Sequence, residues 1–182
     1  MAAEKSDGVL LPLSGKLKAT ALGAVLVTFT TTLPYLTLLN TFFFSGVFLA
    51  GMAAVYYAVI AYQARLSYNQ AFVLGSFCGI AGGMFSETIS YMLIALAGYR
   101  PGMEGLKLMV DWARDMAAGK PELTEQLRVL TEMEALALAP VSLTPADLFT
   151  GILFAAVFYA PIAGLGGLFT VFRLKRQAAK GR

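Results

Sequence analysis

The chain has 182 residues, of which 58% are hydrophobic and only 14% are charged. Soluble domains are roughly 45–50% apolar and 25% charged, so this composition excludes an ordinary soluble domain and predicts an integral membrane protein. The net charge of +3 comes from basic residues at segment ends, and because they form no basic face with interleaved aromatic side chains, we expect no nucleic-acid partner.

The first two membrane helices are predicted at residues 17–38 and 41–62, after a polar N-terminal segment, 1–16. A bilayer core of about 30 Å needs roughly 20 apolar helical residues. Residues 1–16 lack the ordered regions of a signal peptide, so the first helix is expected to remain as an anchor. Pro34 and Asn40 predict a tight turn between the two helices, because proline disfavours helix in the preceding residue and asparagine tolerates turn geometry.

The third membrane helix is predicted at residues 69–98. Ser67 and Gln70 have the spacing of a capping box, in which the serine hydroxyl accepts from the Gln70 amide and the glutamine side chain reaches back. Arg100, Pro101 and Gly102 mark the end of this helix, since glycine and proline follow helix C-termini.

Residues 100–145 are predicted to form an amphipathic helical hairpin outside the membrane. Apolar residues recur at helical spacing in two runs, 103–116 and 123–137. The sequence "GKP" at 119–121 separates the runs, with glycine suited to end one helix and proline to open the next. Trp112 suits an interfacial position, so we expect the hairpin to lie on the outer membrane face or on a partner.

The fourth membrane helix is predicted at residues 146–172. It opens with Thr144 as N-cap, Pro145 at the first helical position and Asp147 near the positive end of the helix dipole. Pro161 and the following "AGLGG" predict a kink, which we interpret as either a hinge or a site of close packing. The elements together predict an all-α fold: a four-helix transmembrane bundle with an extracytoplasmic hairpin, in one membrane domain, 1–182.

Basic residues predict the orientation of these helices. They precede the first helix, lie between the second and third, and follow the fourth in a tail, 173–182, whereas the segment 100–145 is net acidic. Four crossings place all the basic groups on one side, which the positive-inside rule assigns to the cytoplasm. Both termini are therefore expected to be cytoplasmic. The basic residues are Lys5, Lys16, Lys18, Arg65, Arg173, Lys175, Arg176, Lys180 and Arg182.

Small residues recur at every fourth position on three of the predicted helices. Such stripes let helix backbones approach in lipid, where association gains little from the hydrophobic effect. We interpret them as packing positions within the bundle, and the alternative is self-association or docking to another subunit. They are Gly46, Ala50, Ala54 and Ala58 on the second helix, Gly75, Gly79 and Gly83 on the third, and Ala156, Ala160 and Gly164 on the fourth.

Glu87 is a carboxylate inside the third predicted helix, near mid-membrane. An ionisable residue there costs about 2.5–3.5 kcal/mol on insertion scales and usually faces an interior or a cavity. We expect a neutral, protonated carboxyl beside Gly83, Ser90 and Tyr91. Three interpretations stay open: a structural hydrogen-bond hub, a site for a proton, cation or ligand, and a contact to a missing subunit.

The stretch "TFTTTLPY" supplies candidate partners for Glu87. Its hydroxyl groups belong to Thr28, Thr30, Thr31, Thr32 and Tyr35. Threonine can bond to the backbone of its own helix, which is the simpler interpretation. The alternative is a polar pocket in which these hydroxyls face the carboxyl.

Reactive groups are scarce in this sequence. Histidine is absent, and Cys78 is the single cysteine, inside an apolar run. These facts argue against histidine-ligated haem, a zinc site and an intramolecular disulfide. The sequence contains neither a phosphate-binding glycine loop with lysine nor a nucleophile elbow. We therefore expect no catalytic residue, no metal and no cofactor.

The stretch "LPYLTLLNTFFFSGVFLAGMAAVYY" resembles a group of small bacterial integral membrane proteins of unknown function, through its proline, its Leu-Leu-Asn turn and its Gly and Ala positions. Members of that group often carry cysteine after the asparagine. Here residues 41–44 are threonine and three phenylalanines, so no role of those thiols carries over. The resemblance covers most of the chain as an architecture, implies a bacterial inner-membrane location and brings no catalytic residue.

Two functional hypotheses follow. The first is a non-enzymatic accessory or scaffold subunit, in contact with the bilayer and with either another membrane protein or a second copy. The second is a small oligomeric transporter or channel that uses a polar site at Glu87. An enzyme acting on lipid comes third, and only the amphipathic insert favours it.

Overall fold

The computed structural model describes residues 11–118, 120, 123–139 and 142–180, and within these residues the chain is helical and has no β-strand. The all-α class expected from the sequence is confirmed. Most of the N-terminal segment 1–16, Gly119 and Pro121 of the predicted break, and the last two residues of the tail lie outside the described residues. The helices are α1 (Leu13–Thr32), α2 (Leu38–Thr41), α3 (Ser45–Tyr62), α4 (Tyr68–Ala97), α5 (Met103–Ala117), α6 (Thr124–Leu138) and α7 (Pro145–Lys180).

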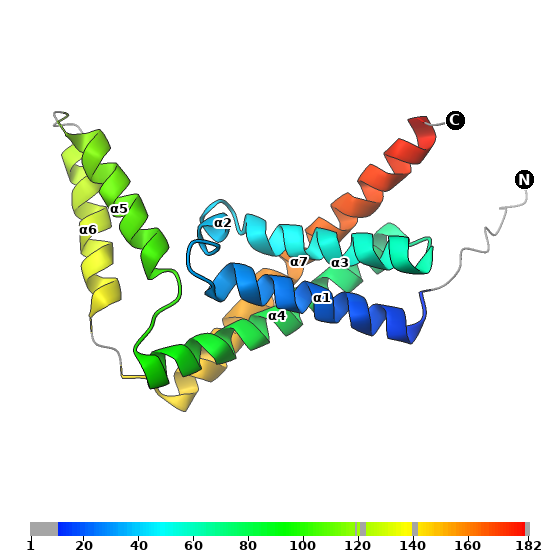
Figure 1. Ribbon diagram of the computed structural model, residues 1–182, viewed down its shortest axis with the longest axis horizontal. Coiled ribbons are helices and arrows are strands. Elements are labelled where there is room, and N and C mark those ends of the chain that lie inside the picture. Colours follow the sequence, from blue (N-terminus) through cyan, green and yellow to red (C-terminus); the bar gives the residue numbers. More distant parts are fainter. Residues whose placement is uncertain (1–10, 119, 121–122, 140–141, 181–182) are drawn as a thin grey trace, which may run out of the picture.

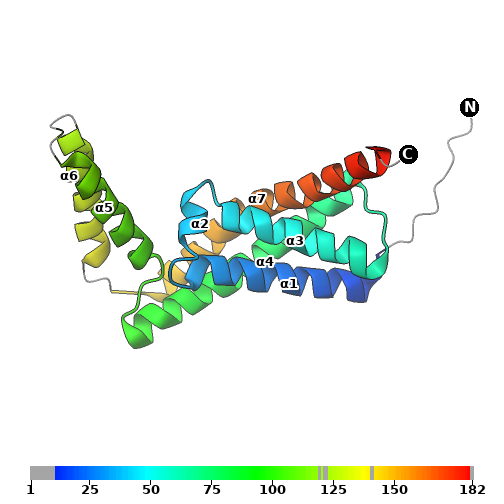
Figure 2. The ribbon, with the colours of Figure 1, turned by 45° about the horizontal axis from the view of Figure 1, so that its top comes forward.

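Helices α1, α3, α4 and α7 pack into one elongated bundle in which successive long helices run in opposite directions (Figure 1). α4 contacts each of the other three, and α7 contacts both α3 and α4. α5 and α6 pack against each other and stand away from the bundle, at the end where α4 finishes and α7 begins (Figure 2). The bundle and the α5–α6 pair are thus two distinct regions of one chain.

The bundle buries small side chains and exposes large ones. Its fully buried side chains include Val27 and Val55, and none of this fully buried set is larger than valine in the described residues. Phe85, Phe154 and Leu153 point outward and are 61%, 60% and 57% exposed. A soluble bundle would bury such side chains, whereas lipid solvates them. The arrangement fits a bundle surrounded by a bilayer.

Three helices of the bundle are long and apolar enough to cross a membrane: α3, α4 and α7. The chain is therefore a membrane protein. α1, which corresponds to the predicted span 17–38, is not among the three. Lys16 and Lys18 in its first half and its cluster of threonines make α1 more polar than the others.

The connection between α1 and α3 differs from the predicted tight turn between helices 17–38 and 41–62. α1 ends at Thr32 because Leu33, which precedes Pro34, is extended with ψ 138°. α3 begins only at Ser45, and the short helix α2 lies between them. The connection is therefore longer than the predicted turn, and it consists of the structured segment 33–44.

The starts of α4 and α7 follow the predicted capping chemistry. The Ser67 hydroxyl accepts from the Gln70 amide at 3.2 Å while the Gln70 side chain accepts from the Ser67 amide at 3.0 Å, which confirms the capping box. At α7, the Asp147 carboxylate accepts from the Thr144 amide at 2.7 Å. α7 has 36 residues and continues through Pro161 to Lys180, beyond the predicted end at 172.

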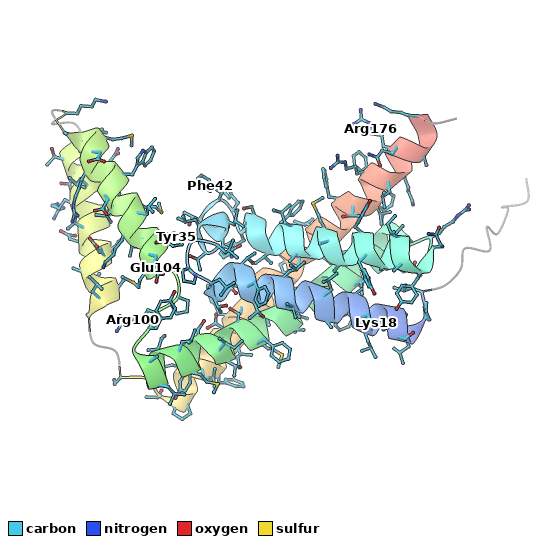
Figure 3. The ribbon with its side chains drawn as sticks, in the orientation of Figure 1. Lys18, Tyr35, Phe42, Arg100, Glu104 and Arg176 are labelled. Atoms are coloured by element: carbon cyan, nitrogen blue, oxygen red, sulfur yellow. The ribbon has the colours of Figure 1, made fainter. Side chains whose placement is uncertain are left out.

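Charged groups separate between the two ends of the bundle. Lys18 and Arg176 lie at the end where α1 starts and α7 finishes (Figure 3). Arg100 and Glu104 lie at the other end, near the α5–α6 pair (Figure 3). The end that holds Lys18 also receives Arg65, because residues 63–67 join α3 to α4 there.

Candidate functional site

The contact between α4 and α7 brings two backbones together. A Cβ atom added at Gly75 or Gly79 would collide with the backbone carbonyl oxygen of Ala163 or Tyr159, respectively. One at Gly83 would lie 3.0 Å from the Cβ of Ala155. Gly75 and Gly79 therefore have no room for a side chain without displacement of α7, whereas Gly83 is tight but less restricted. Small residues are expected at such positions between helices in lipid.

Glu87 occupies the next position in the same series. Its Oε2 would lie 2.8 Å from a Cβ atom added at Gly151. The side chain is half-buried, and within the described residues it has no hydrogen bond and no salt bridge to another side chain. Gly151 thus provides the space in which the Glu87 carboxyl rests against α7.

Two of the threonines, Thr28 and Thr31, contact a different side of α4, the one that packs against α1. The Thr28 hydroxyl donates to the Ala24 carbonyl at 2.9 Å and lies 3.4 Å from the Gly82 carbonyl of α4. The Thr31 and Ser86 hydroxyls hydrogen bond at 2.6 Å. The pocket of Glu87 and threonine hydroxyls that the sequence suggested is therefore not assembled in this chain.

The remaining members of the predicted polar set stay apart from Glu87 as well. The Thr30 hydroxyl donates to the Val27 carbonyl at 3.0 Å, and the Thr32 hydroxyl donates to the Thr28 carbonyl at 2.6 Å. Each of these groups is satisfied within its own helix, as threonine in a membrane helix commonly is. Ser90 and Tyr91 are half-buried on α4 and make no hydrogen bond with Glu87 in the described part of the chain.

The other predicted packing positions are divided among several helix contacts. Ala50 and Ala54 are buried on α3, where Ala54 approaches Gly23 of α1. On α7, Gly164 lies against Phe72 and Ser76, and the amide nitrogen of Ala160 lies beneath Gly79. Sequence reasoning missed two glycines of the α3–α7 contact, of which only Gly166 belongs to the "AGLGG" motif. They are Gly51, which meets the Ala163 carbonyl, and Gly166, which meets the Phe48 carbonyl.

Asn40 joins the end of α1 to the start of α3. Pro34 has no amide hydrogen, so the Thr30 carbonyl loses its partner four residues along the helix. The Asn40 side-chain nitrogen donates to that carbonyl at 2.8 Å, and its Oδ1 accepts from the Val47 amide at 3.2 Å. Gly46 makes room for this arrangement, because a Cβ there would lie 2.7 Å from the Asn40 Oδ1.

The α5–α6 pair is held together by polar contacts. Arg114 of α5 lies 3.5 Å from Glu134 of α6. Arg100 donates to the carbonyls of Ala137 and Ala139, and so binds carbonyl groups that a helix C-terminus leaves without partners. The pair is thereby tied to the end of α4.

Both helices of this pair expose apolar side chains in helical register. Trp112 is 63% exposed on α5 and Leu136 is 74% exposed on α6. We call this exposed set the hairpin stripes. Polar groups flank it: the Arg128 guanidinium, for example, pairs with Glu125 at 2.6 Å and with Glu132 at 2.8 Å. The hairpin stripes are Leu108, Trp112 and Met116 on α5 and Val129, Met133 and Leu136 on α6.

These features define a helical membrane protein with two candidate sites. One is the half-buried Glu87 carboxyl between α4 and α7, and the other is the set of exposed apolar side chains on α5 and α6. Within the described residues, no group of three or more His, Cys, Asp or Glu side chains could hold a metal ion. Comparison with family models, with curated proteins and with solved structures finds no match to the chain. We therefore infer function from these two sites.

Proposed function

We propose that the protein is a non-enzymatic accessory or scaffold subunit of a bacterial inner-membrane complex. The observation that carries this proposal is the α5–α6 pair, which stands away from the bundle and exposes the hairpin stripes. Its partner is another membrane protein or a second copy of the chain. Membership of the group of small bacterial membrane proteins that the Pro34–Asn40 region resembles stays a prediction.

The proposed topology has four crossings, with α1 as the first. α1 contacts α3 and α4 along its length, from Gly15, which lies against Tyr62, to Thr31, which bonds Ser86. A helix in such contact with two spanning helices shares their depth in the bilayer. Bonding of its threonine hydroxyls within α1 lowers the cost of placing them in lipid. Both termini and Arg65 then lie on the basic side, the cytoplasm by the positive-inside rule.

The hairpin stripes support docking on physical grounds. Large exposed side chains are expected on the bundle, where acyl chains cover them, but α5 and α6 lie outside it. There a surface bearing Trp112 and Met133 gains free energy when another apolar surface covers it, and aromatic side chains contribute most to such contacts. The contacts made by Arg100 and Arg114 restrain the hairpin before it binds, which reduces the entropy lost on docking.

The first test truncates the centre of the proposed docking surface. Trp112→Ala should weaken association by about 2 kcal/mol or more, roughly 30-fold, which is the effect of a buried tryptophan anchor. Lys107→Ala is the matched control, since it also shortens an exposed side chain of α5 and should change affinity little. The measurement is native mass determination after extraction in mild detergent, with identification of each co-purifying chain. A third variant, which lacks residues 103–138, removes the whole hairpin. Associations that survive both Trp112→Ala and the deletion would end the proposal.

A small oligomeric transporter or channel is the second candidate, and Glu87 is the observation that favours it. A carboxyl that rests on Gly151 without a side-chain partner is expensive inside a bilayer, and ions or protons that bind it would offset that cost. Glu87→Gln should then reduce proton or sodium flux in proteoliposomes to the level of empty liposomes. Asp115→Asn on the exposed face of α5 is the control. Wild-type flux in the Glu87→Gln protein, or none in the wild type, removes this candidate.

A further inference from the structure

A groove of about 610 Å³ lies between the first turns of α1 and α4, at the basic end of the bundle. Its volume falls within the 300–1,000 Å³ typical of small-molecule sites. The wall from α1 includes Lys16, Leu17 and Thr20, and the wall from α4 includes Gln70 and Phe77. The hairpin and the Glu87 region, on which the proposed function rests, lie near the other end and contribute nothing to it.

The ammonium and amide groups of the groove lie in its outer half, beside three leucines, Leu11, Leu13 and Leu66. Lys16 and Gln70 stand near the starts of their helices, where the bundle ends. The Gln70 carbonyl is already occupied by the Ser67 amide, which leaves its NH₂ group as a donor. Further along α4 the wall becomes apolar, through Val73 and the 57% exposed Phe77. On α1 the 62% exposed Leu17 follows Lys16 directly, and Thr20 lies one turn deeper.

The dimensions of the groove match a membrane interface. From Asn69 to Phe77 the helix rises about 12 Å. One headgroup layer of a bilayer is roughly 5–8 Å thick. A groove that begins at the basic end of the bundle therefore passes through the headgroup layer and continues into the hydrocarbon, with Lys16 and Gln70 at headgroup depth and Val73 and Phe77 reaching acyl-chain depth.

We propose that this groove binds one acidic phospholipid. The headgroup phosphate pairs with the Lys16 ammonium and accepts from the Gln70 amide, while an acyl chain lies along Leu17, Val73 and Phe77. Charge selects the acidic lipid, because a lysine near the membrane surface attracts anionic headgroups by about fivefold in affinity per basic residue. The open, apolar inner part selects a lipid over a water-soluble anion, which could not fill it.

The experiment compares two lipids with the same oleoyl chains, phosphatidylglycerol and phosphatidylcholine, added to the full-length protein in mild detergent. Native mass spectrometry counts the lipids that remain bound. The wild type should retain phosphatidylglycerol at about fivefold lower concentration than phosphatidylcholine. Lys16→Gln should abolish this preference. Lys18→Gln, the same change on an exposed part of α1 outside the groove, should keep it.

A second pair of variants tests the inner part of the groove. Val73→Trp fills it from a 44% exposed position and should lower retention of both lipids, whereas Val25→Trp, 49% exposed on α1 but outside the groove, should not. Equal retention of the two lipids by the wild type would overturn the proposal. Equal effects of Lys16→Gln and Lys18→Gln on lipid retention would also overturn it. A lipid-free dimer that Lys16→Gln dissociates would do the same, because a second copy of the chain would then occupy the groove.

Discussion

Helix α4 packs on α7 with one face and on α1 with another, and the two contacts use different interactions. Toward α7, Gly75 and Gly79 bring backbones together, so the contact is dispersion between main chains. Toward α1, the Ser86 hydroxyl and the Gly82 carbonyl form hydrogen bonds with threonine side chains. Both contacts are close, since a Cβ atom added at Gly82 would collide with the Cβ of Val27 on α1. Only the contact with α1 should also be sensitive to the removal of polar side-chain atoms.

Gly79→Ala should give the largest effect. The added methyl group would collide with the backbone carbonyl of Tyr159, which cannot move without shifting α7. We expect a loss of about 3 kcal/mol in the free energy of unfolding, the upper part of the usual range for overpacking. The measurement is denaturant unfolding in mixed micelles. Gly83→Ala is the matched control with a smaller loss, because its nearest neighbour is the Ala155 side chain at 3.0 Å. Equal losses would show that backbone contact is not what limits this interface.

Asn40→Ala should have an intermediate effect on the free energy of unfolding. Asn40 bonds to α1 and α3 rather than to α4, so this variant tests a third site. It leaves the Thr30 carbonyl and the Val47 amide without their partner, and unsatisfied groups cost about 1–3 kcal/mol. We expect a loss of about 2 kcal/mol that adds to that of Gly79→Ala, since the sites share no partner. Gln63→Ala removes an exposed amide that bonds only the Ile60 carbonyl, and it should change stability little. A loss as small as that of Gln63→Ala would contradict the role of Asn40.

Thr31→Val should have the smallest effect of the three. It keeps the side-chain shape and removes the hydrogen bond to Ser86, and such bonds between membrane helices average about 0.6 kcal/mol. Thr88→Val is the control, because the Thr88 hydroxyl is exposed and bonds only the Met84 carbonyl of its own helix. The same unfolding assay should separate the two variants. A Thr31→Val loss as large as that of Gly79→Ala would remove the distinction between the two faces.

Local chemistry could be predicted from the sequence more fully than spatial arrangement. The capping box at Ser67 depends only on residues three apart, and the structure contains it. The end of α1 is also set locally, by Pro34, but the sequence pattern placed it six residues too late, at 38 instead of 32, because the apolar run continues past the proline.

The interfaces could not be predicted in the same way. Glu87 and Thr31 are both polar and both lie in long helices, so composition alone suggested that they meet. The rotation of α4 decides the question: Ser86 faces α1 and Glu87 faces α7, although they are adjacent in sequence. Helical periodicity shows which residues share a face, but it does not show which neighbour each face meets.

The length of α4 has a mechanical consequence. An ideal helix of 30 residues, the length of α4, extends about 45 Å, whereas the hydrocarbon core measures about 30 Å. Fitting all of α4 into that core by tilt alone would need an inclination of roughly 48°, beyond the 0–40° range of membrane helices. Part of α4 must therefore extend beyond the hydrocarbon core into the headgroup layers. Because α5 begins only a few residues after α4 ends, the thickness of the hydrocarbon core helps to set how far the hairpin lies from the acyl chains.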